Sequence, residues 1–100
     1  MAELCLTILC PPPLAERVLD TLLTMPEILF FTSSAASAHG LEHSALNATE
    51  QVLGMARMTR IEALLLHATR AEVVAQLNSA LAGTGLKYWM SPVTEAGEFR

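Results

Sequence analysis

The chain has 100 residues and a mass of 10.8 kDa, the size of one domain with a single modest core. Six basic residues against ten acidic ones give a formal net charge of −4. This balance argues against a nucleic-acid-binding surface and against docking on an anionic membrane. Apolar residues make up 52% of the chain and charged residues only 16%, a composition that excludes a disordered protein.

The chain contains no run of about 20 apolar residues, the length that a membrane-spanning helix needs. Its first residues, Met1 to Leu6, include no basic side chain, whereas a secretory signal begins with positive charge. We therefore expect a cytoplasmic protein that does not insert into a membrane.

The first third of the chain predicts a strand, a helix and a second strand. Apolar residues alternate over residues 3–10, and Pro11 to Pro13 end this strand because proline has no N–H to donate. Apolar side chains at helical spacing follow, closed by Pro26: Leu14, Val18, Leu22 and Met25. A short apolar run then predicts the second strand over residues 28–32.

The middle of the chain is rich in serine and alanine, so we expect a long mobile loop over residues 34–58. Within this loop Asn47 and Glu50 have the spacing of a capping box. They predict a short helix over residues 48–53, which Gly54 ends.

The last third predicts a strand over residues 58–67, a helix and a final strand over residues 86–93. Thr69 and Glu72 have the spacing of a capping box at the start of that helix. The resulting order, β-α-β-β-α-β, is the α+β ferredoxin-like arrangement. We expect one domain over residues 1–100, with a four-stranded antiparallel sheet and two helices on one of its faces.

The predicted strands carry apolar residues on both faces of the sheet: Ile8 and Leu9, Phe30 and Phe31, Leu64 and Leu65, Trp89 and Met90. An antiparallel sheet that meets water on one side is polar there. One subunit has no spare helix to cover the second face. We therefore expect a homo-oligomer in which sheet packs against sheet.

Two histidines and a glutamate of the loop form a candidate metal site. His39, Glu42 and His43 match the H-x-x-E-H pattern of certain zinc peptidases. Gly40 disfavours the helix that this chemistry needs, and the chain has no room for a substrate cleft. We therefore expect no enzyme. Two interpretations stay open: solvated loop histidines, or ligands of a divalent transition metal such as zinc, copper or nickel.

Positive charge and a glycine-rich turn indicate a candidate anion site, made of Arg57, Arg60, Gly83, Thr84, Gly85 and Lys87. Arginine forks suit phosphate or carboxylate, and glycines let backbone N–H groups approach an anion. Such a site would hold an anionic group such as a phosphate. The alternative is surface ion pairs with Glu62 or Glu95, beside glycines that only end a helix.

Several segments occur in order along nearly the whole chain: Leu9-Cys10-Pro11-Pro12, Phe31-Thr32-Ser33, His39-Gly40, His43, Glu50-Gln51-Val52-x-Gly54 and Tyr88-Trp89-x-x-Pro92-Val93. Together they resemble a small, uncharacterised bacterial branch of the PII-like family, the relatives of nitrogen regulatory protein PII. The resemblance implies a βαββαβ fold and a homotrimer whose sheets pack around a central axis.

The resemblance also implies a function. PII-like proteins are ligand-responsive regulators that bind effectors such as nucleotides in the clefts between subunits and contact partner proteins through the long loop. This branch is often found beside genes for heavy-metal efflux, which implies a metal-linked role and a membrane transporter or efflux component as partner. We expect such a regulator; the alternative is a metal-binding accessory protein that acts through His39 and His43.

Overall fold

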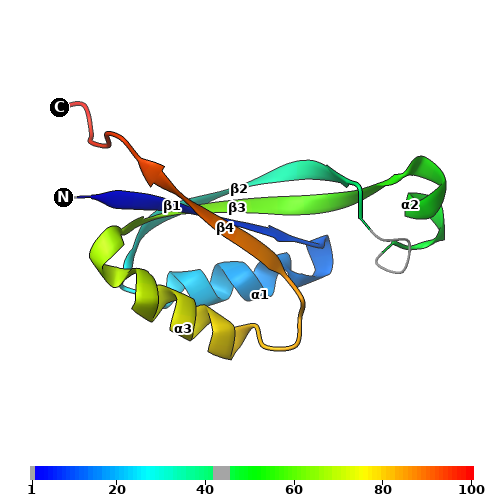
Figure 1. Ribbon diagram of the computed structural model, residues 1–100, viewed down its shortest axis with the longest axis horizontal. Helices are drawn as coiled ribbons and strands as arrows, with labels where there is room; N and C mark the ends of the chain where they lie inside the picture. The colour runs from blue at the N-terminus through cyan, green and yellow to red at the C-terminus, as the bar shows by residue number, and fades with distance from the viewer. Residues whose placement is uncertain (1, 42–45) are drawn as a thin grey trace.

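One sheet and two long helices build the structure, a computed structural model that describes residues 2–41 and 46–100 (Figure 1). The elements run in the order β1 (Glu3–Cys10), α1 (Pro12–Leu23), β2 (Ile28–His39), α2 (Ala48–Leu53), β3 (Met55–Leu66), the 3₁₀ turn η2 (His67–Thr69), α3 (Arg70–Ala80) and β4 (Lys87–Val93). In this described part of the chain, no helix is both long and apolar enough to cross a membrane.

The four strands form one antiparallel sheet in the order β2-β3-β1-β4. The helices α1 and α3 lie side by side on the same face of that sheet, as Figure 1 shows. This layout confirms the predicted ferredoxin-like α+β fold.

The core lies between the sheet and the two helices. Alternate residues of β1 and β3 point toward the helices, and each helix adds one apolar stripe. The buried side chains are Leu4, Leu6, Ile8 and Cys10 from β1, Ile61, Ala63 and Leu65 from β3, Val18 and Leu22 from α1, and Val73 and Leu77 from α3. The apolar positions predicted for the first helix are thus confirmed in the core, with Val18, Leu22 and Met25 buried and Leu14 packed against them.

The prediction of a mobile loop over residues 34–58 is wrong. Strand β2 continues through the serine- and alanine-rich segment to His39, and β3 begins at Met55, so the two strands stay paired from Ile28↔Leu65 to His39↔Met55. Backbone pairing needs no large side chain, since the N–H and C=O groups of alternate residues bond across the ladder between the two strands. The result is a long two-stranded ribbon that extends beyond the helices (Figure 1).

The ribbon ends in α2, whose predicted bounds and caps are confirmed. The Asn47 side chain accepts a hydrogen bond from the Glu50 N–H over 2.8 Å, and the Glu50 carboxylate accepts from the Asn47 N–H over 3.1 Å. Gly54 ends the helix with a φ of 69°, a left-handed conformation that glycine adopts without a Cβ penalty. The Glu50 carboxylate also accepts from the Arg57 N–H over 3.2 Å, which ties α2 to β3.

The predicted capping box of α3 is wrong. The Thr69 hydroxyl donates to the Leu66 carbonyl over 2.8 Å, and no side chain caps the helix. Thr69 closes the 3₁₀ turn η2 with a φ of −96° and a ψ of 2°, whereas an N-cap residue needs extended backbone. Strand β3 correspondingly ends at Leu66, and β4 begins at Lys87 rather than at residue 86.

We expect Asn47→Ala to loosen α2 without unfolding the core. Loss of an N-cap side chain costs about 1 kcal/mol, which corresponds to roughly fivefold faster local opening. Amide hydrogen exchange measures this: α2 amides should exchange about fivefold faster, and those of β1 should not change. Asn47→Ser, which keeps a capping oxygen, should restore most of the protection. Equal exchange rates in Asn47→Ala and the unmodified protein would contradict this account of the ribbon tip.

Candidate functional site

A cleft of about 600 Å³ opens at the base of the ribbon, where β1 stops and β3 continues. β1 ends at Cys10, opposite Thr59, so the first residues of β3 have no neighbour on that side. Segments that are far apart in sequence bound the space: the proline turn after β1, Leu41, the start of α2, the start of β3, and the loop before β4. Its walls include Leu9, Pro11, Pro12, Pro13, Leu41, Ala56, Met58 and Leu86.

Four of the six residues predicted for an anion site line this one cleft: Arg57, Thr84, Gly85 and Lys87. Arg57 comes from the ribbon, and the other three come from the loop before β4 and the first residue of that strand. In the described residues no carboxylate lies within ion-pair distance of Arg57 or Lys87. The two cationic side chains are thus available to an anion, which an arginine fork can hold through two hydrogen bonds.

Hydrogen bonds and two glycines fix the conformation of the loop before β4. The Thr84 hydroxyl donates to the Leu81 carbonyl over 2.7 Å and accepts from the Leu86 N–H over 3.4 Å. Gly83 and Gly85 have φ values of 79° and 70°, which side chains with a Cβ rarely adopt. The Thr84 hydroxyl therefore shapes the cleft wall by fixing the loop.

The cleft also holds one carboxylate that the sequence reading did not assign to it. Glu50 lines the cleft, and its two oxygens accept the backbone N–H groups of Asn47 and Arg57. Those two bonds fix the carboxylate at the wall and leave the lining with a formal charge of +1. The capping-box spacing predicted Glu50 as a helix cap and not as a cleft residue. Glu50 lies at the cleft because the ribbon places α2 beside it, and the sequence did not predict the ribbon.

The other two predicted residues lie elsewhere. Gly83 lines a separate cavity beneath α3. Arg60 pairs with Glu62 at 3.8 Å, with about half of each side chain exposed, as the alternative of a surface ion pair predicted.

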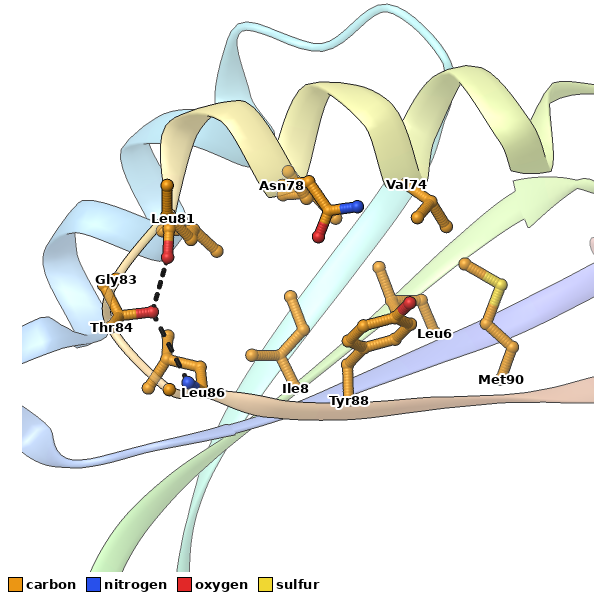
Figure 2. Close-up of a pocket in the computed structure, with 13 residues that line it drawn as sticks. Leu6, Ile8, Val74, Asn78, Leu81, Gly83, Thr84, Leu86, Tyr88 and Met90 are labelled. Atoms are coloured by element: carbon orange, nitrogen blue, oxygen red, sulfur yellow. Dashed lines mark hydrogen bonds between the residues drawn. The ribbon is translucent and has the colours of Figure 1, made fainter.

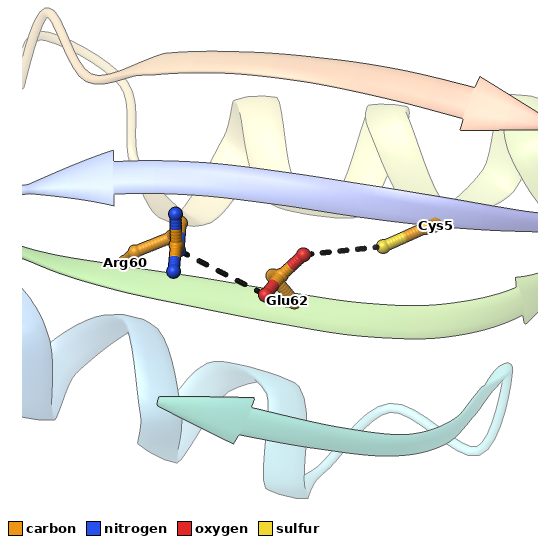
Figure 3. A network of polar contacts seen from close by, with 3 residues as sticks. All are labelled: Cys5, Arg60 and Glu62. Atoms are coloured by element: carbon orange, nitrogen blue, oxygen red, sulfur yellow. Dashed lines mark hydrogen bonds and ion pairs between the residues drawn. The ribbon is translucent and has the colours of Figure 1, made fainter. Parts of the chain in front are cut away.

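Arg60 and Glu62 belong to the sheet face without helices, which we call the open face (Figure 3). The strand registers place these residues on it: Cys5, Thr7 and Leu9 from β1, Phe30 and Thr32 from β2, Arg60, Glu62 and Leu64 from β3, and Lys87, Trp89 and Ser91 from β4. The apolar side chains Phe30 and Trp89 are 60% and 50% exposed. The open face therefore combines large exposed apolar groups with a central ion pair.

Both cysteines are free thiols. Cys5 lies on the open face, where its thiol donates to the Glu62 carboxylate over 3.8 Å (Figure 3). Burial raises the pKa of the Cys5 thiol, and the negative charge of Glu62 raises it further. Burial likewise raises the pKa of the Cys10 thiol in the core. Neither environment activates a nucleophile, since reactive thiols have a lowered pKa.

The predicted metal ligands are only partly described. His39 is exposed at the end of β2, opposite Met55, and Glu42 and His43 lie outside the described residues. Within residues 2–41 and 46–100, no three His, Cys, Asp or Glu side chains cluster as a metal site. The three-residue metal site stays a prediction.

Several solved structures share this fold. A protein of the DUF3240 family from Shewanella baltica OS155 superposes with a TM-score of 0.81 at 16% identity, over 100% of this chain and 99% of that one. The periplasmic divalent cation tolerance protein CutA from Archaeoglobus fulgidus gives 0.71 at 13% identity, over 96% and 88%. The GlnK–ATP complex of Bacillus subtilis gives 0.66 at 14% identity, over 93% and 83%.

These likenesses confirm the PII-like fold expected from the sequence. No curated protein has a sequence similar enough to count as a match. A family model described as "Protein of unknown function (DUF3240)" matches residues 1–100. The chain therefore belongs, over its whole length, to the DUF3240 family.

Proposed function

We propose that this protein is a PII-like regulator that binds a small organic anion in the cleft at the base of the ribbon and carries no catalytic activity. The observation that supports this proposal most directly is that Arg57 and Lys87 line one cleft and form no ion pair with a carboxylate among the described residues. A cationic pair beside an apolar wall suits a ligand with an anionic group and a flat apolar body, such as a nucleotide. The cytoplasmic location stays a prediction from the sequence.

The cleft and the ribbon tip share one group, the Glu50 carboxylate. It caps α2 through the Asn47 N–H and binds β3 through the Arg57 N–H. An anion beside Arg57 would repel this carboxylate and weaken both bonds. Ligand binding would thereby change the order of the tip, where Val52 and Leu53 are 87% and 58% exposed and offer an apolar contact to a partner protein. A transporter or efflux component as that partner stays a prediction.

Self-association through the open face belongs to the same proposal. Phe30 and Trp89 expose apolar area that a second copy of the chain would remove from water. The homotrimer implied by the PII-like resemblance would bury this face around an axis and bring a neighbouring subunit toward the cleft.

A metal-linked function is the second candidate. Its support is the fold likeness to a protein named for divalent cation tolerance, together with His39 at the end of β2. An imidazole is a good ligand for zinc, copper and nickel. His39 would need further ligands, with Glu42 and His43 as the predicted ones.

Calorimetric titration with ATP, ADP, AMP and inorganic phosphate tests the regulator. We expect at least one nucleotide to bind, and Arg57→Ala or Lys87→Ala to weaken it by about tenfold or more, the value of one charge-assisted hydrogen bond. Arg70→Ala is the matched control, because it removes the same charge from the exposed start of α3, outside the cleft lining, and should leave binding unchanged. Equal losses in all three variants would show a general charge effect, and no binding of any anion would refute the effector site.

The open face is tested by Phe30→Glu. A charge buried without a partner should weaken self-association by at least ~100-fold, or about 3 kcal/mol. Sedimentation at micromolar concentration should show the unmodified chain as an oligomer and the variant as a monomer. Leu23→Glu on α1, where the side chain is 71% exposed, should leave the oligomer intact. A monomeric unmodified chain would refute the interface.

Titration with zinc, copper, nickel and cobalt decides the second candidate. Tight binding of one metal that disappears in the double variant His39→Ala, His43→Ala would favour the accessory protein. Metal binding that survives the double variant would contradict these ligands.

A further inference from the structure

A second cavity, of about 220 Å³, lies between α3 and β4 and shares only residues 84–86 with the cleft of the proposed anion site (Figure 2). Its floor is made by Leu6 and Ile8 of the core. Val74 of α3 and Met90 of β4 face the space from opposite sides, as Figure 2 shows. This hollow is half-open at the edge of the core, with exposed residues in its lining, so a small ligand can enter it from solvent.

The chemistry of the lining is apolar and uncharged. All thirteen lining residues lack a charged side chain: Leu6, Ile8, Val74, Leu77, Asn78, Leu81, Ala82, Gly83, Thr84, Gly85, Leu86, Tyr88 and Met90. A charged ligand placed here would lose its hydration without gaining an ion partner. The cavity therefore selects against the anions that suit Arg57 and Lys87.

Two hydrogen-bonding groups reach the cavity from opposite walls. Asn78 extends from α3 and Tyr88 from β4, and Figure 2 shows the amide and the phenol on the two sides of the same space. Within the described part of the chain, neither side chain has a hydrogen-bond partner. An amide and a hydroxyl at the mouth of an apolar space supply the few placed polar groups that orient a small ligand.

We propose that this cavity binds a small neutral molecule with one aromatic ring and a hydrogen-bonding substituent. An apolar cavity of about 150 Å³ holds benzene, so 220 Å³ leaves room for a substituted ring. The ring lies on Leu6 and Ile8, and its substituent meets Asn78 or Tyr88. This site goes beyond the proposed function and stands without it, since neither Arg57 nor Lys87 lines the cavity and only residues 84–86 border both spaces.

Titration of the isotopically labelled full chain with phenol, followed by NMR, tests the site. At millimolar phenol we expect shifts in the backbone signals of Val74, Leu77 and Met90, which line this cavity and not the anion cleft. Benzoate, which has the same ring with a negative charge, should produce none of them. Absence of these shifts with phenol, or equal shifts with benzoate, would overturn the proposal.

Two substitutions test the geometry. Val74→Phe fills the cavity and should abolish the phenol shifts, whereas Ala75→Phe, on the exposed side of α3, should keep them.

Asn78→Leu combined with Tyr88→Phe should lower the ratio of phenol to toluene affinity about tenfold, the value of one hydrogen bond. Asn78 and Tyr88 are both exposed, so this pair leaves the core intact and gives a result even where Val74→Phe does not fold. An unchanged ratio, or phenol shifts that persist in Val74→Phe, would refute the site.

Failure of this proposal and failure of the anion site are distinguishable. The phenol shifts are measured without nucleotide, and the nucleotide titration is measured without phenol. A chain that binds phenol and no anion would refute the regulator alone.

Discussion

The end of β1 is the constraint from which the rest of the molecule follows. Pro11 and the two prolines after it have no N–H to donate, so no strand can continue between β3 and β4 beyond Cys10. β2 and β3 do continue, and they leave the sheet as a ribbon with one unpartnered edge at the start of β3. The cleft occupies the space that β1 vacates, and the proline turn forms part of its wall.

Because of the ribbon, the Glu50 carboxylate contacts both the helix α2 and the cleft. A capping glutamate ordinarily affects only the first turn of its helix. Glu50 also receives the Arg57 N–H, so the order of α2 and the charge in the cleft depend on the same two oxygens. A substitution of Glu50 would therefore disturb the tip and the cleft together. Arg57 and Lys87 carry charge into the cleft without capping a helix, which makes them the cleaner probes.

Side-chain patterns predicted most of the elements, although the capping spacing failed at α3, and the extent of the β2–β3 pairing could not be predicted from them. The alternation of apolar residues predicted β1, and the capping residues Asn47 and Gly54 predicted both ends of α2 correctly. The stretch from Ser33 to Ala38 has no apolar pattern, because its strand is held by the β3 ladder, so it resembled a loop. Four of six anion-site residues converge, but Arg60 pairs with Glu62, two residues further along the same face of β3.

The open face limits how a second copy could cover it. Its apolar groups Phe30 and Trp89 flank the ion pair of Arg60 and Glu62, which water now solvates on about half of its surface. Covering this pair removes that solvation, and an attraction between two charges repays the loss only with good geometry and further hydrogen bonds. A covering subunit must therefore place polar atoms opposite Arg60 and Glu62 while its apolar side chains meet Phe30 and Trp89. That requirement favours one register of packing between the two copies over others. The pair of Arg60 and Glu62 would then supply the specificity of the contact, and Phe30 and Trp89 would supply its affinity.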